Sequence, residues 1–291
     1  MCDEHTEADN AAQARDGNVS RRGFAALAGG ALAACASGPT VDGETLAVSE
    51  RDVTITMADG VCDAHFVHPV RGKHPAVIVW PDIRGLRPAF RQMGKRLAES
   101  GYAVLTVNQF YRAQKAPVVQ AGESFSDPAV RGRLMPMAQA LNAATAAMDA
   151  TAFIGFLDAQ ASVDTRRRIG TAGYCMGGPL VMRTASVSER IGAGASFHGG
   201  GLATDQPTSP HLLIPQMKAS FLIAVAQNDD ARTPQEKETL RAAFAAQGLA
   251  AEIEVYPAQH GWCPPDSPVY DEAQAERAWS RMLALFAKAL V

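Results

Sequence analysis

The hexapeptide Gly173-Tyr174-Cys175-Met176-Gly177-Gly178 follows the apolar run Arg168 to Ala172 and precedes the helically spaced segment Pro179 to Val187. A nucleophile held on a sharp strand-to-helix turn has this form, with glycines on both sides because larger side chains would collide there. The amino end of the following helix favours a thiolate, since its unpaired N–H groups and dipole stabilise negative charge. The hexapeptide therefore predicts a strand, a tight turn and a helix, with Cys175 as a candidate nucleophile. A buried structural cysteine beside glycines that pack a helix on a strand is the alternative.

Apolar runs and helically spaced segments alternate on both sides of this turn. The runs are short and nearly continuous, as in parallel strands that are buried on both faces; they are Ala76 to Trp80, Ala103 to Val107, Arg168 to Ala172, Gly192 to Phe197, Phe221 to Ala226 and Glu252 to Tyr256. The helical segments are Phe90 to Ser100, Ala138 to Ala159, Pro179 to Val187, Pro234 to Gln247 and Asp271 to Leu290. This alternation predicts an α/β fold, a mostly parallel sheet with helices on both faces.

A β-hairpin is predicted ahead of this sheet. Val53 to Met57 and Cys62 to Phe66 flank Asp59-Gly60, a dipeptide typical of a tight turn between two antiparallel strands. The predicted domain runs from residue 46 to residue 291.

The first 45 residues are predicted to be a leader or a disordered tail. Ser20 to Phe24 carries a twin-arginine pattern, and the uncharged run Gly23 to Ala34 is about twelve residues long. Because a membrane span needs roughly twenty apolar residues, this run is typical of a signal sequence. Leu32 to Cys35 resembles a lipoprotein cleavage box, which makes Cys35 a candidate lipid anchor. We expect export by the twin-arginine pathway, to the periplasm or as a membrane-anchored lipoprotein, and a cytoplasmic protein if the leader does not function.

Composition excludes several classes of protein. The 291 residues are 47% apolar and 20% charged, with a net charge of −3, and no basic run attracts nucleic acid. The five cysteines form no C-x-x-C pair, so neither a disulfide scaffold nor a zinc site is indicated. Cys62 and Cys263 could pair in an oxidising compartment. No cofactor and no metal are expected, and the oligomeric state stays open.

Two further strand ends carry residues that complete a catalytic set. Asp229 comes shortly after the run ending at Ala226, and His260 follows the run ending at Tyr256. In a parallel sheet the loops beyond the carboxyl ends of the strands lie together, and the order nucleophile, acid, histidine is that of an α/β-hydrolase triad. Asp230 is the alternative for the acid.

The chain resembles the dienelactone hydrolase family at five places, which are Pro81 to Leu86, Asn108 to Arg112, Gly173 to Gly178, Asn228-Asp229 and His260-Gly261. The resemblance implies an α/β-hydrolase in which Cys175 is the nucleophile, His260 the base and Asp229 the residue that orients the imidazole. It also implies an oxyanion hole formed by the N–H groups of Ile83 and Met176, and a carboxylate near the thiol, here Asp82.

The substrate implied by this resemblance is a lactone or a small activated carboxylic ester. The family's serine and arginine, which clamp a substrate carboxylate, are replaced here by Gly261 and Pro264. Other residues could contact the substrate; the candidates are Tyr111, Arg112, Arg133, His198 and Trp262, with Arg84 and Arg131 as further basic residues. We expect Tyr111 to Met137 to cover the site as a cap. The alternatives are a carboxylesterase of other specificity, or a redox or binding protein on the same scaffold.

Overall fold

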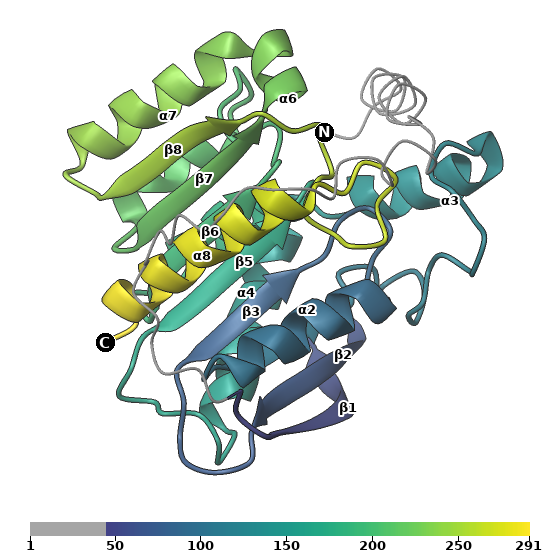
Figure 1. Ribbon diagram of the computed structural model, residues 1–291, viewed down its shortest axis with the longest axis vertical. Helices are drawn as coiled ribbons and strands as arrows, with labels where there is room; N and C mark the ends of the chain where they lie inside the picture. Colours follow the sequence, from purple (N-terminus) through teal and green to yellow (C-terminus); the bar gives the residue numbers. More distant parts are fainter. Residues whose placement is uncertain (1–44) are drawn as a thin grey trace, which may run out of the picture.

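The computed structural model describes residues 45–291 and contains one eight-stranded sheet in the order β1-β2-β4-β3-β5-β6-β7-β8 (Figure 1). The strands are β1 (Val48–Met57), β2 (Gly60–Pro69), β3 (Ala76–Trp80), β4 (Ala103–Val107), β5 (Ile169–Tyr174), β6 (Ile191–Phe197), β7 (Ser220–Ala226) and β8 (Ala251–Tyr256). β3 to β8 pair in parallel, whereas β2 pairs antiparallel with both β1 and β4. The predicted hairpin and the mostly parallel sheet are confirmed.

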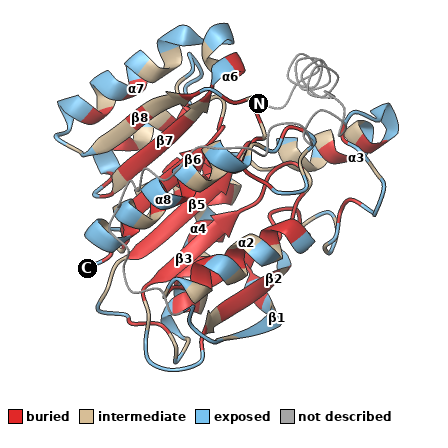
Figure 2. Cartoon of the chain, viewed as in Figure 1, coloured by how far each residue is buried: buried red, intermediate tan, exposed pale blue. Residues whose placement is uncertain are grey.

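Helices cover both faces of the sheet (Figure 1). α2 (Pro88–Glu99) and α8 (Glu272–Ala289) pack on one face, where Phe90, Met282 and Phe286 are fully buried. α4 (Ala143–Asp158), α5 (Gly177–Ser186) and α7 (Pro234–Ala246) pack on the other. Figure 2 shows that the central strands are buried throughout, and β3 to β6 expose almost no side chain. Such burial on both faces explains why these strands are continuous apolar runs.

The single helix predicted over residues 138–159 is wrong at its start. The chain there forms two helices, α3 (Pro128–Gln139) and α4, separated by a short turn. Asn142 caps α4 by accepting hydrogen bonds from the N–H groups of Ala144 and Thr145, and the Thr145 side chain bonds back to Asn142. This reciprocal capping satisfies N–H groups that would be unpaired at the helix start, so the helix begins after Asn142.

Two short elements were not predicted. A 3-10 helix covers Pro210–Gln216, and α6 (Gln227–Arg232) follows β7 directly. Because α6 contains Asp229, the predicted triad acid lies on a short helix and not on a loop.

A disulfide between Cys62 and Cys263 does not form. Cys62 belongs to the core cluster under α4 and α5, whereas Cys263 belongs to the cluster under α2 and α8, on the opposite face of the sheet. Both thiols are free and buried. Burial raises the pKa of each well above that of an ordinary thiol.

The predicted twin-arginine pattern and the lipid anchor at Cys35 lie outside the described residues. From residue 45 onward, no single helix has the length and apolar character to cross a membrane; α3 and α4, bent by 78°, meet that criterion only as a pair.

Candidate active site

Cys175 lies at the turn between β5 and α5, in a left-handed backbone conformation with φ of 54°. The turn is tight because α5 begins close to the end of β3. A Cβ atom added to Gly177 would lie 2.4 Å from the carbonyl oxygen of Trp80, and one added to Gly173 would lie 2.2 Å from that of Gly177. The glycines around Cys175 are therefore required by close backbone contacts, as the sequence predicts.

Cys175, His260 and Asp229 are brought together from three strand ends. The Nδ1 atom of His260 lies 2.7 Å from Oδ2 of Asp229, and the backbone N–H of His260 donates to Oδ1 of Asn228 at 2.8 Å. On its other side His260 is hydrogen-bonded to the Cys175 side chain. Asp230, the alternative acid, instead pairs with Lys237. The carboxylate in contact with His260 is thus that of Asp229.

His260 is buried, with only 2% of its surface exposed. Burial alone would lower its pKa, but the charge of Cys175 and the hydrogen bond and charge of Asp229 outweigh burial and raise the pKa of His260 to about 10. At neutral pH the imidazole of His260 is therefore protonated, and it lies between the Cys175 sulfur and the Asp229 carboxylate.

His198 lies directly beside this group, at the end of β6. Its Nδ1 atom accepts a hydrogen bond from the backbone N–H of Cys175 at 3.1 Å, so the proton of the neutral ring is on Nε2. The ring centroid lies 5.1 Å from that of His260 and 5.0 Å from that of Trp262. Burial and the neighbouring His260 hold the pKa of His198 well below its usual value. His198 is therefore neutral and supports Cys175 through its backbone.

A cavity of about 430 Å³ opens above Cys175 and His260. Its wall is formed by Asp82, Ile83, Arg84, Arg87, Glu123, Ser124, Phe125, Cys175, His198, His260, Gly261, Pro265, Asp266, Ser267 and Pro268. Met176 packs against the cluster that contains Ile83, and within the described residues neither the Ile83 N–H nor the Met176 N–H is used in a hydrogen bond. Both N–H groups are therefore available beside Cys175.

The predicted cap borders this cavity. Glu123, Ser124 and Phe125 lie on its wall, and Phe125, Val130 and Leu134 pack together with Ile83. Figure 1 shows α3 beyond the carboxyl ends of the central strands.

Asp82 lies on the wall of the cavity, but its carboxylate is bound by Arg87. The Nη1 and Nη2 atoms of Arg87 lie 2.6 and 2.9 Å from the two Asp82 oxygens, and the N–H of Arg84 donates to Oδ1 at 2.9 Å. Arg87 also contacts Asp266 through Nε at 2.7 Å. Sequence analysis assigned no role to Arg87, Asp266 or Asn228. Asn228 belongs to the Asn228-Asp229 pair that carries part of the family resemblance, whereas nothing in the sequence connects Asp266 with residues 82–87.

The other predicted substrate contacts lie outside this cavity. Tyr111 and Arg112 bind Asp59 and Asp149. Arg133 donates to Glu123 at 2.6 Å. The Trp262 ring is fully buried and stacks on Tyr256, 5.3 Å away. Among the five candidates, only His198 lies on the wall of the cavity.

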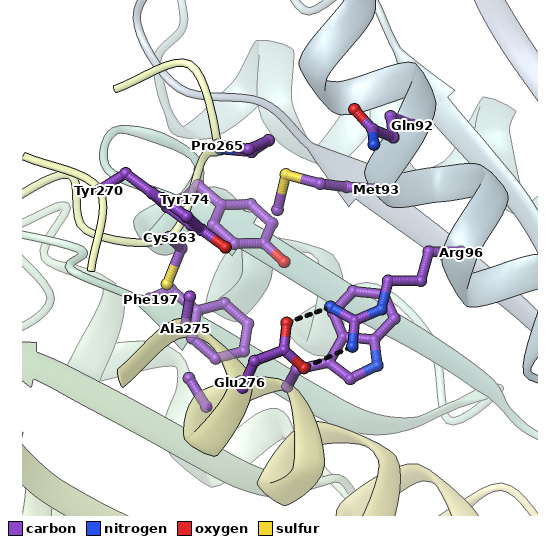
Figure 3. Close-up of a pocket in the computed structure, with 12 residues that line it drawn as sticks. Gln92, Met93, Arg96, Tyr174, Phe197, Cys263, Pro265, Tyr270, Ala275 and Glu276 are labelled. Carbon is purple, nitrogen blue, oxygen red and sulfur yellow. Dashed lines mark hydrogen bonds and ion pairs between the residues drawn. The ribbon is translucent and has the colours of Figure 1, made fainter. Parts of the chain in front are cut away.

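A second pocket of about 130 Å³ lies behind the strand ends, between α2 and the segment leading into α8 (Figure 3). The rings of Tyr174 and Phe197 stack with their centroids 5.0 Å apart and face this pocket. These two residues directly precede Cys175 and His198. Arg96 and Glu276 form an ion pair at its edge, at 2.6 Å (Figure 3). The aromatic side chains of this pocket thus pack directly behind the residues of the active site.

Comparison with known proteins gives consistent matches. The sequence model of the dienelactone hydrolase family matches residues 62–290. A curated relative from Salmonella typhi, provisionally named as a carboxymethylenebutenolidase, is 28% identical over 75% of this chain and 78% of its own length. A relative from Methylorubrum extorquens with the same provisional name is 25% identical over 79% of this chain and 78% of its own length.

Solved structures show the same fold. A crystal structure from Klebsiella pneumoniae, provisionally named as a dienelactone hydrolase, has a TM-score of 0.72 and 24% identity, covering 83% of this chain and 99% of that one. A dienelactone hydrolase-like phosphotriesterase from metagenomic libraries has a TM-score of 0.70 and 22% identity, covering 84% of this chain and 100% of that one. The architecture described above is therefore the α/β-hydrolase fold.

Proposed function

Because this chain belongs to the dienelactone hydrolase family and is a hydrolase, we propose that it cleaves a lactone or a small activated carboxylic ester with Cys175 as nucleophile. The observation that carries the proposal is the contact of His260 with both Asp229 and Cys175 at the base of an open cavity.

In the proposed reaction the Cys175 thiolate attacks the carbonyl carbon of the substrate. The charge that develops on the carbonyl oxygen is stabilised by the N–H groups of Ile83 and Met176. When the carbon–oxygen bond of the ester breaks, protonated His260 gives its proton to the leaving oxygen. The product at this stage is a thioester on Cys175; a lactone opens without releasing a fragment.

The second half of the reaction restores the enzyme. Neutral His260 accepts a proton from water, and the resulting hydroxide attacks the thioester carbonyl. The carbon–sulfur bond then breaks, which releases the carboxylic acid and restores the Cys175 thiolate. Asp229 holds Nδ1 of His260 throughout, so Nε2 faces the reacting atoms and the charge on the imidazolium is balanced.

A thiol nucleophile favours activated substrates. A thiolate is itself a good leaving group, so the first intermediate returns to starting material unless the alcohol leaves easily. Enol esters, lactones of enols and aryl esters meet this condition, whereas simple alkyl esters do not.

The experiment that tests the proposal measures hydrolysis of a dienelactone and of 4-nitrophenyl acetate by the full chain. We expect Cys175→Ala to abolish turnover of every substrate accepted. Asp229→Asn should lower kcat by about 100-fold or more, because general-base catalysis contributes roughly that much, while Asp230→Asn serves as the matched control and keeps its activity. Rapid quenching and mass spectrometry should detect one acyl group on Cys175.

Two outcomes would overturn the proposal. One is full turnover by Cys175→Ala. The other is a protein that hydrolyses neither substrate while Cys175 still reacts with peroxide or an alkylating reagent, which would favour a redox or binding role.

A further inference from the structure

We infer that the active-site cavity selects uncharged substrates, because carboxylates of the cavity itself, chiefly Asp266, already bind the arginines that line it. The inference rests on the proposed function and specifies its substrate class. It differs from the expectation that another arginine replaces the missing carboxylate clamp.

Arg87 has no free charge to offer a substrate. It lies between Asp82 and Asp266, with both Asp82 oxygens within 2.9 Å of its guanidinium and both Asp266 oxygens at 2.7 and 2.9 Å. Only 5% of the residue is exposed. The two carboxylates raise the pKa of Arg87 further although burial opposes the charge, so the ion is permanent and doubly paired. A substrate carboxylate would have to displace one of two bidentate partners, which is unfavourable.

Arg84 is the second arginine on the wall. Its Nη1 atom lies 3.2 Å from Oδ2 of Asp266 and 3.3 Å from the backbone carbonyl oxygen of the same residue. Asp266 thus neutralises Arg84 in addition to its contact with Arg87. The contacts of Arg84 are longer and fewer than those of Arg87, so Arg84 is the cation whose availability depends most on Asp266.

The remaining charges near the cavity are paired in the same way. Glu123, on the cap, binds Arg133, so this predicted substrate contact is also engaged. His260 shares its charge with Asp229 and Cys175. Among the described residues that line the cavity, every cation therefore has a carboxylate partner.

This arrangement decides between two kinds of substrate. An anion that enters the cavity loses its hydration, and no unpaired cation is present to replace the lost water. It also approaches the carboxylates of Asp82, Asp266 and Glu123, which repel it. A neutral ester or lactone loses little hydration. The physical expectation is discrimination against carboxylate-bearing substrates.

The test compares 4-acetoxybenzamide with 4-acetoxybenzoate, two aryl esters of nearly the same size that differ by one charge. For the full chain we expect kcat/KM, corrected for the hydroxide-catalysed rate of each ester, to favour the amide by at least about tenfold. Asp266→Asn frees Arg84 and part of Arg87, and should narrow this preference by about tenfold. Asp158→Asn is the matched control, because Asp158 also pairs with an arginine, Arg190, and its side chain has the same 35% exposure as that of Asp266. The ratio of kcat/KM for the amide to that for the benzoate should be the same in Asp158→Asn as in the unchanged protein.

A second measurement does not depend on turnover. Rates of Cys175 alkylation by neutral iodoacetamide and anionic iodoacetate, read at the Cys175 peptide by mass spectrometry, should shift toward iodoacetate in Asp266→Asn. Arg84→Gln should have the opposite effect: the preference for 4-acetoxybenzamide over 4-acetoxybenzoate should grow, and alkylation by iodoacetate should slow relative to iodoacetamide. This variant keeps the inference testable if Asp266→Asn does not fold.

The outcomes separate this inference from the proposed function. If neither ester is hydrolysed but the alkylation ratio shifts as described, charge selection stands and the hydrolase proposal fails. If the unchanged protein hydrolyses the benzoate as well as the benzamide, or if Asp266→Asn and Asp158→Asn show the same preference, the inference is overturned.

Discussion

Cys175 and His198 share an unusual backbone conformation and a hydrogen bond. Within residues 45–291 they are the only residues other than glycine with a positive φ, at 54° and 41°. The N–H of Cys175 is shared between the carbonyl oxygen of Phe197 and Nδ1 of His198. Strained residues of this kind persist only where their surroundings hold them in place. His198 supplies part of that support, because its buried ring is packed between His260 and Trp262.

The protonation of His260 gives a prediction for stability against pH. Its pKa is raised from 6.5 to about 10 in the folded protein, so between these values the folded state binds more protons than the unfolded state. The contribution of the group is complete below pH 6.5 and is lost as pH rises toward 10. We expect the difference in free energy of unfolding between the unchanged protein and His260→Gln to fall over this range.

Urea unfolding of both proteins at pH 6, 8 and about 9.5 measures this difference. Groups that do not contact His260 occur in both chains and cancel. Cys175 is coupled to His260 and does not cancel, so the same comparison is repeated in the Cys175→Ala background, where the difference should still fall with pH because Asp229 keeps its contact with the imidazole. A difference that stays constant or grows with pH would contradict a protonated His260 in the folded state.

At the scale of the element, the turn from β5 to α5 depends on backbone contacts with β3. Gly177 begins α5 and approaches the carbonyl oxygens of both Trp80 and Pro81, at the end of β3. Strand, turn and helix are thus fixed by one close contact, which also brings Ile83, just after β3, near Met176.

Gly177→Ala should disrupt this contact. Its Cβ would lie 2.4 Å from one backbone oxygen and 3.0 Å from another, so the turn must shift, at a cost of about 1–3 kcal/mol in stability. We expect kcat on an aryl ester to fall by at least about tenfold, because a displaced Cys175 loses alignment.

Gly155→Ala is the control for this change. Gly155 lies in α4 with nothing within 4 Å of an added Cβ, so alanine should stabilise the helix by up to about 1 kcal/mol and leave kcat unchanged. Thermal unfolding and steady-state kinetics of both variants distinguish a contact at Gly177 from a general effect of alanine. The same change in stability and in kcat for both variants would argue against a close contact between residue 177 and the backbone at the end of β3.

At the scale of the whole molecule, an ionic cluster ties the hairpin to a helix on the face of the sheet. Arg112 and the Tyr111 hydroxyl, after β4, bind Asp59 in the turn between β1 and β2 and Asp149 in α4. The Asp149 side chain is almost completely buried, with 1% of its surface exposed. Arg112 therefore acts in the packing of the molecule, although sequence analysis placed it among the candidates for substrate contact.

Arg112→Ala should destabilise the fold by about 3 kcal/mol or more, because it leaves the charge of Asp149 buried without its arginine. The folded fraction should keep the kcat/KM of the unchanged protein. Combining Arg112→Ala with Asp149→Asn should recover part of the stability, since the buried charge is removed. Loss of kcat/KM at unchanged stability would instead return Arg112 to the substrate site.

The sequence alone determined the sheet, the two faces of helices and the three residues proposed for catalysis. The strands were predictable because burial on both faces requires continuous apolar runs, and β3 and β4 have the bounds that those runs predict. The meeting of Cys175, Asp229 and His260 was predictable because each follows a strand of a parallel sheet, whose carboxyl ends lie together.

Only the tertiary structure decided which charges meet. It paired Asp229, and not Asp230, with His260, directed Arg112 to Asp149, and joined Arg87 to Asp266 across 179 residues. It also kept Cys62 and Cys263 apart on opposite faces of the sheet. The physical reason is that hydrophobic patterning is local and periodic, whereas an ion pair depends on the position and burial of two side chains, which the packing of distant segments sets.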